Sequence, residues 1–344
     1  MIAIEKIDKI EKDNLPLLTV LTGEDIGQFS HLKEQFMKKI GFDKDDLTYS
    51  YFDLSEVDYQ DAEMDLLSLP FFADYKIVIF DHFQDITTQK KNFLKDTELK
   101  ALETYLENPL DTTRLILFAP GKLDGKRRLV KLLKRDGHIL EANPLKSNEL
   151  TTYFQKYSHQ LKLSFDSGVF EKLLIKSNDD FSQMMKNLLF LKSYKKSGVI
   201  GLSDIDEAIP KSLQDNIFEL TRLVLQKNSD QARELVHDLR LTGEDEIKLI
   251  AIMLGQFRLF LQIAILTQQG KNEQVIIMSL SDLLGRKINP YQVRYAIKDS
   301  RTLTIDFLEK ALKILIETDY QIKTGLYEKS YLFDLAILKL LSLT

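Results

Sequence analysis

Residues 64–80 read Met-Asp-Leu-Leu-Ser-Leu-Pro-Phe-Phe-Ala-Asp-Tyr-Lys-Ile-Val-Ile-Phe and carry apolar side chains on both sides of a proline. Apolar residues recur at spacings of three and four before that proline: Tyr59, Ala62, Leu66 and Leu69. This spacing predicts an amphipathic helix. Pro70 ends the helix, because a proline steers the preceding residue away from the α conformation. The continuous apolar run after Lys76 is typical of a parallel strand that is buried on both faces.

The turn between this helix and this strand contains Leu69, Phe71 and Phe72. Connections of this kind run over the protein surface. Two adjacent phenylalanines cannot both point into one core from a tight turn. In one interpretation, one ring packs inside and the other lies outside. In the other, the turn is an apolar plug for a pocket on a partner protein, since buried aromatic anchors dominate the energetics of interfaces.

Strand and helix signals alternate from residue 15 to about residue 145. Strands are predicted at 17–22, 47–54, 76–80, 114–118 and 138–141, and further helices at 26–40, 97–107 and 125–135. Strands that alternate with helices at this spacing predict a parallel sheet with helices on its faces. Ligands of such sheets bind at the carboxyl ends of the strands, so a nucleotide site would be expected there.

The residues at that edge do not fit a working nucleotide site. The first predicted strand leads into the segment 23–30, where a P-loop would read Gly-x-x-x-x-Gly-Lys-Ser/Thr. No lysine follows Gly27, and Glu24 and Asp25 bring negative charge to the place of the phosphate. After the third strand, Asp81 is followed by His82 where an ATPase of this type has a second acid. The pattern resembles an AAA+ module without its chemistry.

Other catalytic patterns are missing from the sequence. The 5 histidines are scattered without metal-ligand spacing, there is no cysteine, and no serine lies in a Gly-x-Ser-x-Gly elbow. We therefore expect no catalytic residues, no bound metal and no cofactor. The lack of cysteine fits a reducing cytoplasm. Residues 1–12 do not resemble a signal peptide, and we expect no run near the roughly 20 apolar residues that span a bilayer.

The segment 121–135 stands out by its charge, with seven basic residues against one acid. Leu129, Leu132 and Leu133 form an apolar stripe, so this segment is predicted as a helix with a basic outer face. The basic face is either simply solvated or contacts DNA phosphates or an acidic subunit. The candidate contact residues are Lys126, Arg127, Arg128 and Lys131. Because the net charge of the chain is −5, any contact with DNA must be local or made together with other subunits.

The rest of the chain is predicted to be helical. After a linker near residue 145, helices at 147–161, 166–176, 179–195 and 203–209 form a small all-helical unit. From residue 213 onward all segments are helical, and the helix 245–267 is apolar nearly all round, which predicts a central position in a bundle. The expected domains are 1–145 (α/β, AAA+-like), 146–210 (helical lid) and 211–344 (all-helical collar).

Several of these stretches together resemble the delta subunit family of the bacterial DNA polymerase III clamp loader. They are the helix, Leu-Pro-Phe-Phe turn and strand, the pattern Lys-Leu-Asp-x-Lys-Arg-x-Leu-x-Lys-x-Leu from Lys122, and the segments 215–220, 243–258 and 319–325. The resemblance covers the whole chain through several moderately specific motifs. The Ser-Arg-Cys arginine finger that ATP-coupled relatives carry after the fourth strand is missing here.

The resemblance implies a function in replication. It implies that Leu69, Phe71 and Phe72 bind the sliding clamp (the beta subunit) and that the chain opens its ring or holds it open. The collar would join the ATPase subunits and delta-prime in a pentamer that holds primer–template DNA. The family belongs to a nucleotidyltransferase holoenzyme, but no catalysis is expected of this chain. Two alternatives remain: an adaptor unconnected with replication, and a P-loop ATPase with a divergent loop.

Tyr320 lies near the end of the predicted helix 305–323 and is followed by Lys323. In one interpretation its ring packs against the next helix. In the other the ring faces the lumen of the collar and stacks on a template base, while Lys323 contacts a phosphate.

Overall fold

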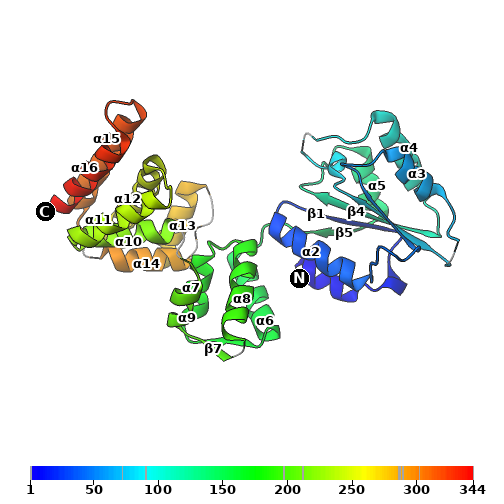
Figure 1. The fold of residues 1–344 in the computed structure, drawn as a ribbon, viewed down its shortest axis with the longest axis horizontal. Coiled ribbons are helices and arrows are strands. Elements are labelled where there is room, and N and C mark those ends of the chain that lie inside the picture. The colour runs from blue at the N-terminus through cyan, green and yellow to red at the C-terminus, as the bar shows by residue number, and fades with distance from the viewer. Residues whose placement is uncertain are drawn as a thin grey trace. The chain divides into compact units, whose positions relative to one another are not determined.

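The structure is a computed structural model that describes residues 2–71, 73–89, 91–196, 198–210, 213–285, 288, 290–301 and 303–343. The chain folds into two compact units, Met1–Phe154 and Gln155–Thr344. Figure 1 shows a sheet in the first unit and mainly helices in the second.

A five-stranded parallel sheet forms the centre of the first unit. Its strands are β1 (Leu18–Gly23), β2 (Tyr49–Asp53), β3 (Lys76–Asp81), β4 (Thr113–Pro120) and β5 (His138–Glu141), in the order β2-β3-β4-β1-β5. The register pairs Val20 with Leu117 and with Ile139 on the two sides of β1. Every residue of β1 and β3 is buried. The predicted parallel sheet is therefore confirmed.

Helices cover both faces of this sheet (Figure 1). One face carries α1 (Ala3–Lys6) and α2 (Ile26–Lys39), and the other carries α3 (Tyr59–Leu67), α4 (Asp96–Glu107) and α5 (Arg128–Asp136). The core on the second face packs Val20, Val78 and Leu117 of the strands against the helices. The helical residues of this core include Leu66, Leu102, Leu129 and Leu133.

Two elements of this unit begin two or more residues later than predicted. The strand predicted at 47–54 begins at Tyr49, because the carboxylate of Asp46 accepts hydrogen bonds from the Thr48 amide (2.9 Å) and hydroxyl (2.7 Å) and makes a local turn. The helix predicted at 125–135 begins at Arg128, since the Lys126 amide donates to the carboxylate of Asp124 in another turn.

The first part of the second unit contains helices and a small sheet. After α6 (Ser147–Gln160) come α7 (Val169–Lys176), α8 (Phe181–Lys195) and α9 (Leu202–Ala208). The strands β6 (Leu163–Phe165) and β7 (Gly198–Ile200) pair in parallel, so the expectation of an all-helical unit was wrong here. Strands of three residues are too short for an alternating pattern to reveal them.

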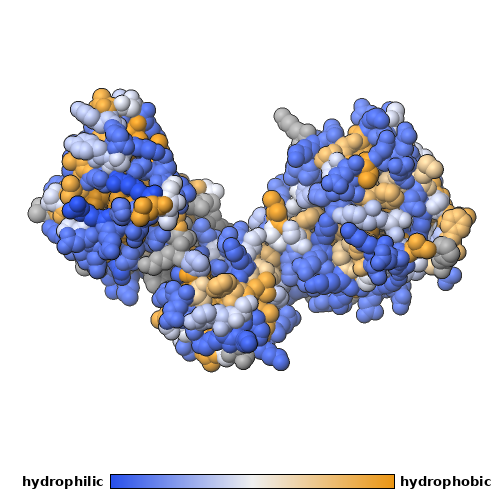
Figure 2. Space-filling view, in the orientation of Figure 1, coloured by the Kyte–Doolittle hydropathy of each residue, from blue (hydrophilic) through white to orange (hydrophobic). Residues whose placement is uncertain are grey.

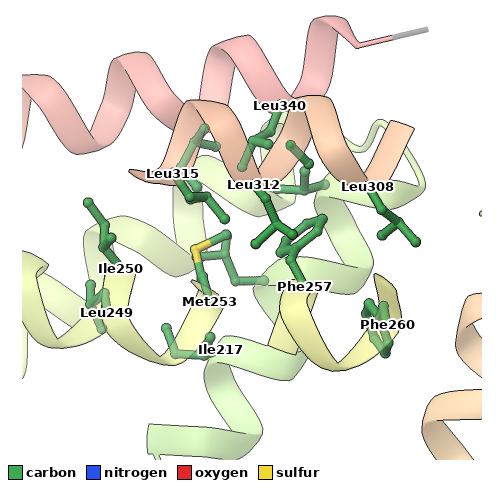
Figure 3. Packing of buried hydrophobic residues seen from close by; sticks show 14 of the residues in the cluster. Ile217, Leu249, Ile250, Met253, Phe257, Phe260, Leu308, Leu312, Leu315 and Leu340 are labelled. Atoms are coloured by element: carbon green, nitrogen blue, oxygen red, sulfur yellow. The ribbon is translucent and has the colours of Figure 1, made fainter. Parts of the chain in front are cut away.

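The remainder of the unit is a helical bundle around α12. It consists of α10 (Leu213–Leu225), α11 (Ser229–Leu241), α12 (Glu246–Gln268), α13 (Glu273–Leu284), α14 (Pro290–Ser300), α15 (Ile305–Lys323) and α16 (Lys329–Ser342). Figure 3 shows Met253 and Phe257 of α12 pointing towards Leu312 of α15. Because α12 contacts α10 and α13–α16, its predicted central position is confirmed.

α12 is the helix in the described part of the chain that is long and apolar enough to cross a membrane. The sequence suggested no such segment, because Gln256 and Arg258 interrupt the apolar run. The helix nevertheless stays apolar enough with these two residues included, so that expectation is corrected. Leu249, Met253 and Phe257 are fully buried in the bundle core. We therefore interpret α12 as a core helix.

Candidate functional site

The turn after α3 presents apolar side chains to solvent. α3 ends at Leu67, and the Ser68 amide caps it by donating to the carbonyls of Met64 (3.2 Å) and Asp65 (3.1 Å). Leu69 is 64% exposed and Phe71 is 88% exposed. Phe72 lies outside the described residues. Phe71 is thus directed outwards, and residues 69–71 are called the apolar turn below.

Further apolar residues surround the apolar turn. Leu47, which is 76% exposed, lines the same cavity of about 170 Å³ as Leu69 and Phe71. Met64 and Leu67 of α3 are also exposed. Apolar side chains emerge at several places on a mostly hydrophilic surface, as Figure 2 shows for one face. Exposed apolar patches are typical of protein or membrane interaction sites and of ligand-binding grooves, so these residues are the candidate binding surface.

Sequence analysis missed the contribution of Leu47 because that residue was assigned to the strand predicted at 47–54. The signal that could have placed it was the Asp46-Leu47-Thr48 sequence, in which an aspartate two residues before a threonine favours a turn.

The edge where a nucleotide would bind has a different geometry from a P-loop. β1 ends at Gly23 and α2 begins at Ile26, so only Glu24 and Asp25 connect them. The Asp25 carboxylate caps α2 by accepting a hydrogen bond from the Gln28 amide at 3.0 Å. Amide groups at a helix N-terminus are the donors that hold phosphate in nucleotide-binding proteins. Here a carboxylate of the chain itself occupies that place.

The place of the P-loop lysine is likewise filled by a side chain that serves the fold. Gln28 is fully buried, and its Nε2 atom donates to the carbonyl of Asn143 at 2.9 Å. This bond ties the start of α2 to the segment after β5. Gln28 therefore stabilises the fold and carries no charge for a phosphate.

Asp81 is the remaining acid of the expected ATPase pair. Its carboxylate is occupied by hydrogen bonds and an ion pair within the unit. It is buried and forms an ion pair with Lys33 of α2. The Tyr51 hydroxyl and the His82 amide (2.8 Å) also donate to its carboxylate. Burial of Tyr51 and its hydrogen bond to Asp81 raise the pKa of the Tyr51 hydroxyl, so this group stays protonated and remains a donor.

The histidine at the place of the second acid pairs with β2. The Nδ1 atom of His82 lies 3.0 Å from a carboxylate oxygen of Asp53. The pKa of Asp53 lies below its ordinary value. Burial alone would raise this pKa, but hydrogen bonds from Ser55 and the contact with His82 together lower it by more. A cavity of about 840 Å³ remains at this edge, lined among others by Lys33, Asp81 and His82. Among the described residues, no group of three or more His, Asp or Glu side chains is placed to hold a metal ion.

The basic segment is partly neutralised within the first unit. Arg128 pairs with Glu107 and lies 3.9 Å from Glu103, and Arg127 lies 3.8 Å from Asp124. Lys126 and Lys131 are exposed, and no ion pair joins them to any described residue. Exposed ion pairs contribute little free energy, so all four residues stay candidates for contact with a phosphate or an acidic subunit.

Tyr320 lies on the surface of the helical bundle. Its side chain is 68% exposed, so most of the ring is open to solvent, and its stacking on a template base stays a prediction. Lys323 forms an ion pair with Asp319 at 2.8 Å on the same helix. Tyr327 and Tyr331 are also exposed, with their ring centroids 6.4 Å apart, and sequence analysis did not single them out.

The fold and its carboxyl edge define a class of protein: a parallel α/β unit whose carboxyl edge is filled by the chain's own side chains, joined to helical regions. Comparison with protein families identifies the member of this class. Residues 20–143 match the model of "DNA polymerase III, delta subunit", and residues 214–340 match "DNA polymerase III delta subunit, C-terminal domain". The chain belongs to the DNA polymerase III delta subunit family, as the resemblance in its sequence implied.

Two individual relatives agree with this assignment. The DNA polymerase III subunit delta of Bacillus subtilis (strain 168) is 28% identical over 298 residues, which cover 86% of this chain and 84% of the relative. The solved structure of the Bacillus subtilis DNA clamp loader delta protein (YqeN) matches with a TM-score of 0.56 and 25% identity, covering 98% of both chains.

The geometry of the carboxyl edge predicts that the isolated chain does not bind ATP. Millimolar Mg-ATP should not raise the melting temperature of the isolated chain, because a ligand stabilises only a state that it binds. The measurement is thermal denaturation with and without ATP. A clear rise that disappears in Gly27→Val would contradict the interpretation of this edge. Gly23 is unsuited to such a test, since an added Cβ there would lie 2.1 Å from the Ala142 carbonyl oxygen and disturb the fold.

Proposed function

We propose that this chain is the clamp-loader subunit that binds the sliding clamp and opens its ring, or holds it open, for loading onto primed DNA. The observation that carries this proposal is the exposure of Phe71 at a turn fixed by Pro70. Transfer of an exposed phenyl ring from water into an apolar pocket is favourable, so the ring favours binding to a partner that has such a pocket. Leu69 and Leu47 extend the apolar surface around this ring.

The proposed activity is protein binding without catalysis by this chain. Two features support it: Asp25 caps the helix where phosphate would bind, and Asp81 is paired with Lys33. Nucleotide would then be bound and hydrolysed by partner subunits, whose conformational changes would decide when the clamp is engaged.

We further propose three functional regions and the partners that each one meets. Residues 1–145 would carry the clamp-binding surface, residues 146–210 would form the lid, and residues 211–344 would form the collar that meets the ATPase subunits and delta-prime. The site of action would be the cytoplasm, within a polymerase holoenzyme and not on a membrane. A helical adaptor unconnected with replication is the alternative that a clamp-binding measurement would exclude.

Replacement of both phenylalanines, Phe71→Ala with Phe72→Ala, should abolish measurable clamp binding. Loss of two central aromatic anchors costs at least about 2–4 kcal/mol of binding free energy, or roughly 30-fold in affinity. Isothermal titration calorimetry with the sliding clamp of the same organism measures this change, and circular dichroism checks that the fold is retained.

Phe190→Ala is the matched control for this experiment. Phe190 is another exposed ring, at 50% exposure on α8, and its removal should leave clamp affinity unchanged. The proposal fails if the double variant is folded and binds the clamp as tightly as the control. Loss of both fold and binding would instead support a core position for one of the two rings.

Tyr320→Ala should weaken primer–template binding by the reconstituted loader. Stacking of an aromatic ring on a base contributes about 1–3 kcal/mol, so the affinity should fall by roughly fivefold or more. Clamp binding by the isolated subunit should stay unchanged, since Tyr320 lies outside the clamp-binding unit. Fluorescence anisotropy with labelled primer–template measures the first effect. An unchanged primer–template affinity would assign Tyr320 to a different contact.

A further inference from the structure

Lys76 is a buried lysine at the base of the apolar turn. It is the first residue of β3 and only 5% exposed, which is unusual for a lysine because burial of an unpaired ammonium group is costly. Its backbone is held in the sheet, where its amide donates to the Thr112 carbonyl at 2.9 Å and its register partner is Thr113 on β4. The ammonium group therefore extends from a fixed point.

The contacts of this ammonium group lie on the other side of the turn. Its Nζ atom donates to the Ser68 hydroxyl at 2.7 Å and to the backbone carbonyl of Asp65, and it lies 3.4 Å from the Asp65 carboxylate. Asp65 is in the last turn of α3, where backbone carbonyls point outwards and attract positive charge. Lys76 thus joins the end of α3 to the start of β3, across the segment that contains the apolar turn.

A second pair of contacts anchors the same segment next to Lys76. The Tyr75 hydroxyl donates to the Lys12 carbonyl at 2.8 Å, and the guanidinium group of Arg114 lies 5.0 Å from the centre of the Tyr75 ring. The base of the segment is therefore fixed by polar contacts, while Leu69 and Phe71 at its tip are exposed. This is the arrangement of a preorganised binding loop.

We propose that Lys76 is a positioning residue for partner binding by the apolar turn. This inference rests on the proposed clamp-binding function and deepens it. Lys76 holds residues 69–71 in the conformation that binds, so that the partner does not have to order the turn. Preorganisation of this kind raises affinity by lowering the entropy cost of association.

The test uses Lys76→Met in the full chain, which keeps the length and apolar stem of the side chain and removes its charge. Clamp affinity should fall roughly tenfold, because the turn must then be ordered on binding. Backbone amides of residues 66–76 should exchange hydrogen faster in the free variant than in the parent protein. Lys33→Met is the matched control: it also removes an ammonium group that pairs with a carboxylate, here the buried Asp81 at the other end of β3, and when folded by circular dichroism it should leave clamp affinity unchanged.

A double-mutant cycle with Phe71→Ala separates positioning from general destabilisation. If Lys76 acts through the turn, Lys76→Met should cost much less affinity on the Phe71→Ala background than on the parent background. An equal cost on both backgrounds would overturn the inference. So would unchanged affinity of Lys76→Met while Phe71→Ala alone weakens binding, a result that would leave the proposed function standing. If Phe71→Ala has no effect either, the proposed function itself fails.

Ser68→Ala keeps the test decisive if Lys76→Met does not fold. This variant removes one acceptor of the ammonium group and leaves the lysine, its contact with the Asp65 carbonyl and the ion pair in place. It should weaken clamp binding severalfold with faster amide exchange in residues 66–76. Parent-like affinity and exchange in folded Ser68→Ala would overturn the inference.

Discussion

The burial of β3 between β2 and β4 is the constraint on which the position of the apolar turn depends. All six residues of this strand are buried, so its start at Lys76 is fixed in the sheet. α3 must pack Tyr59, Ala62 and Leu66 on the same sheet, which fixes the end of the helix as well. Between these fixed points, the described residues 68–71 and 73–75 are exposed or half-buried. Pro70 and the contacts of Lys76 restrict the conformations of this segment.

The side chains at the carboxyl edge of the same sheet have a structural role. The buried carboxylate of Asp81 on β3 binds Lys33 of α2 and Tyr51 of β2, and so joins α2 to two neighbouring strands. Removal of Lys33 would leave this buried carboxylate without its counter-ion, which lowers stability. Asp81, at the position of an ATPase acid, therefore stabilises the fold of this unit. The cavity at this edge lies at the carboxyl ends of the parallel strands.

Much of the fold could be predicted because its signals are local. Apolar runs revealed the strands, and the apolar face of residues 305–323 predicted α15 with the bounds that the structure shows. Pro70 likewise predicted the turn. The strands β6 and β7 escaped prediction because each has only three residues and finds its partner far along the chain.

The contacts of Lys76 below the apolar turn could not be predicted either, because they join residues that are not local in the sequence. Lys76 begins an apolar run and shows no local sign that it is buried. Its partners, Ser68 and Asp65, lie eight and eleven residues earlier and meet it only once α3 packs on the sheet. The exposure of Leu47 depends on a turn made by the Asp46 side chain, which weakens a strand signal that looked continuous.

Cross-linking at single residues shows whether the apolar turn enters a pocket on the sliding clamp, as we propose. A photoreactive phenylalanine analogue placed at position 71 of the full chain should cross-link to the clamp of the same organism on illumination. The same analogue at position 190 should not. Cross-linking from position 71 to apolar pocket residues of the clamp is the predicted result. No cross-link from position 71, in a complex that forms with normal affinity, would contradict the account.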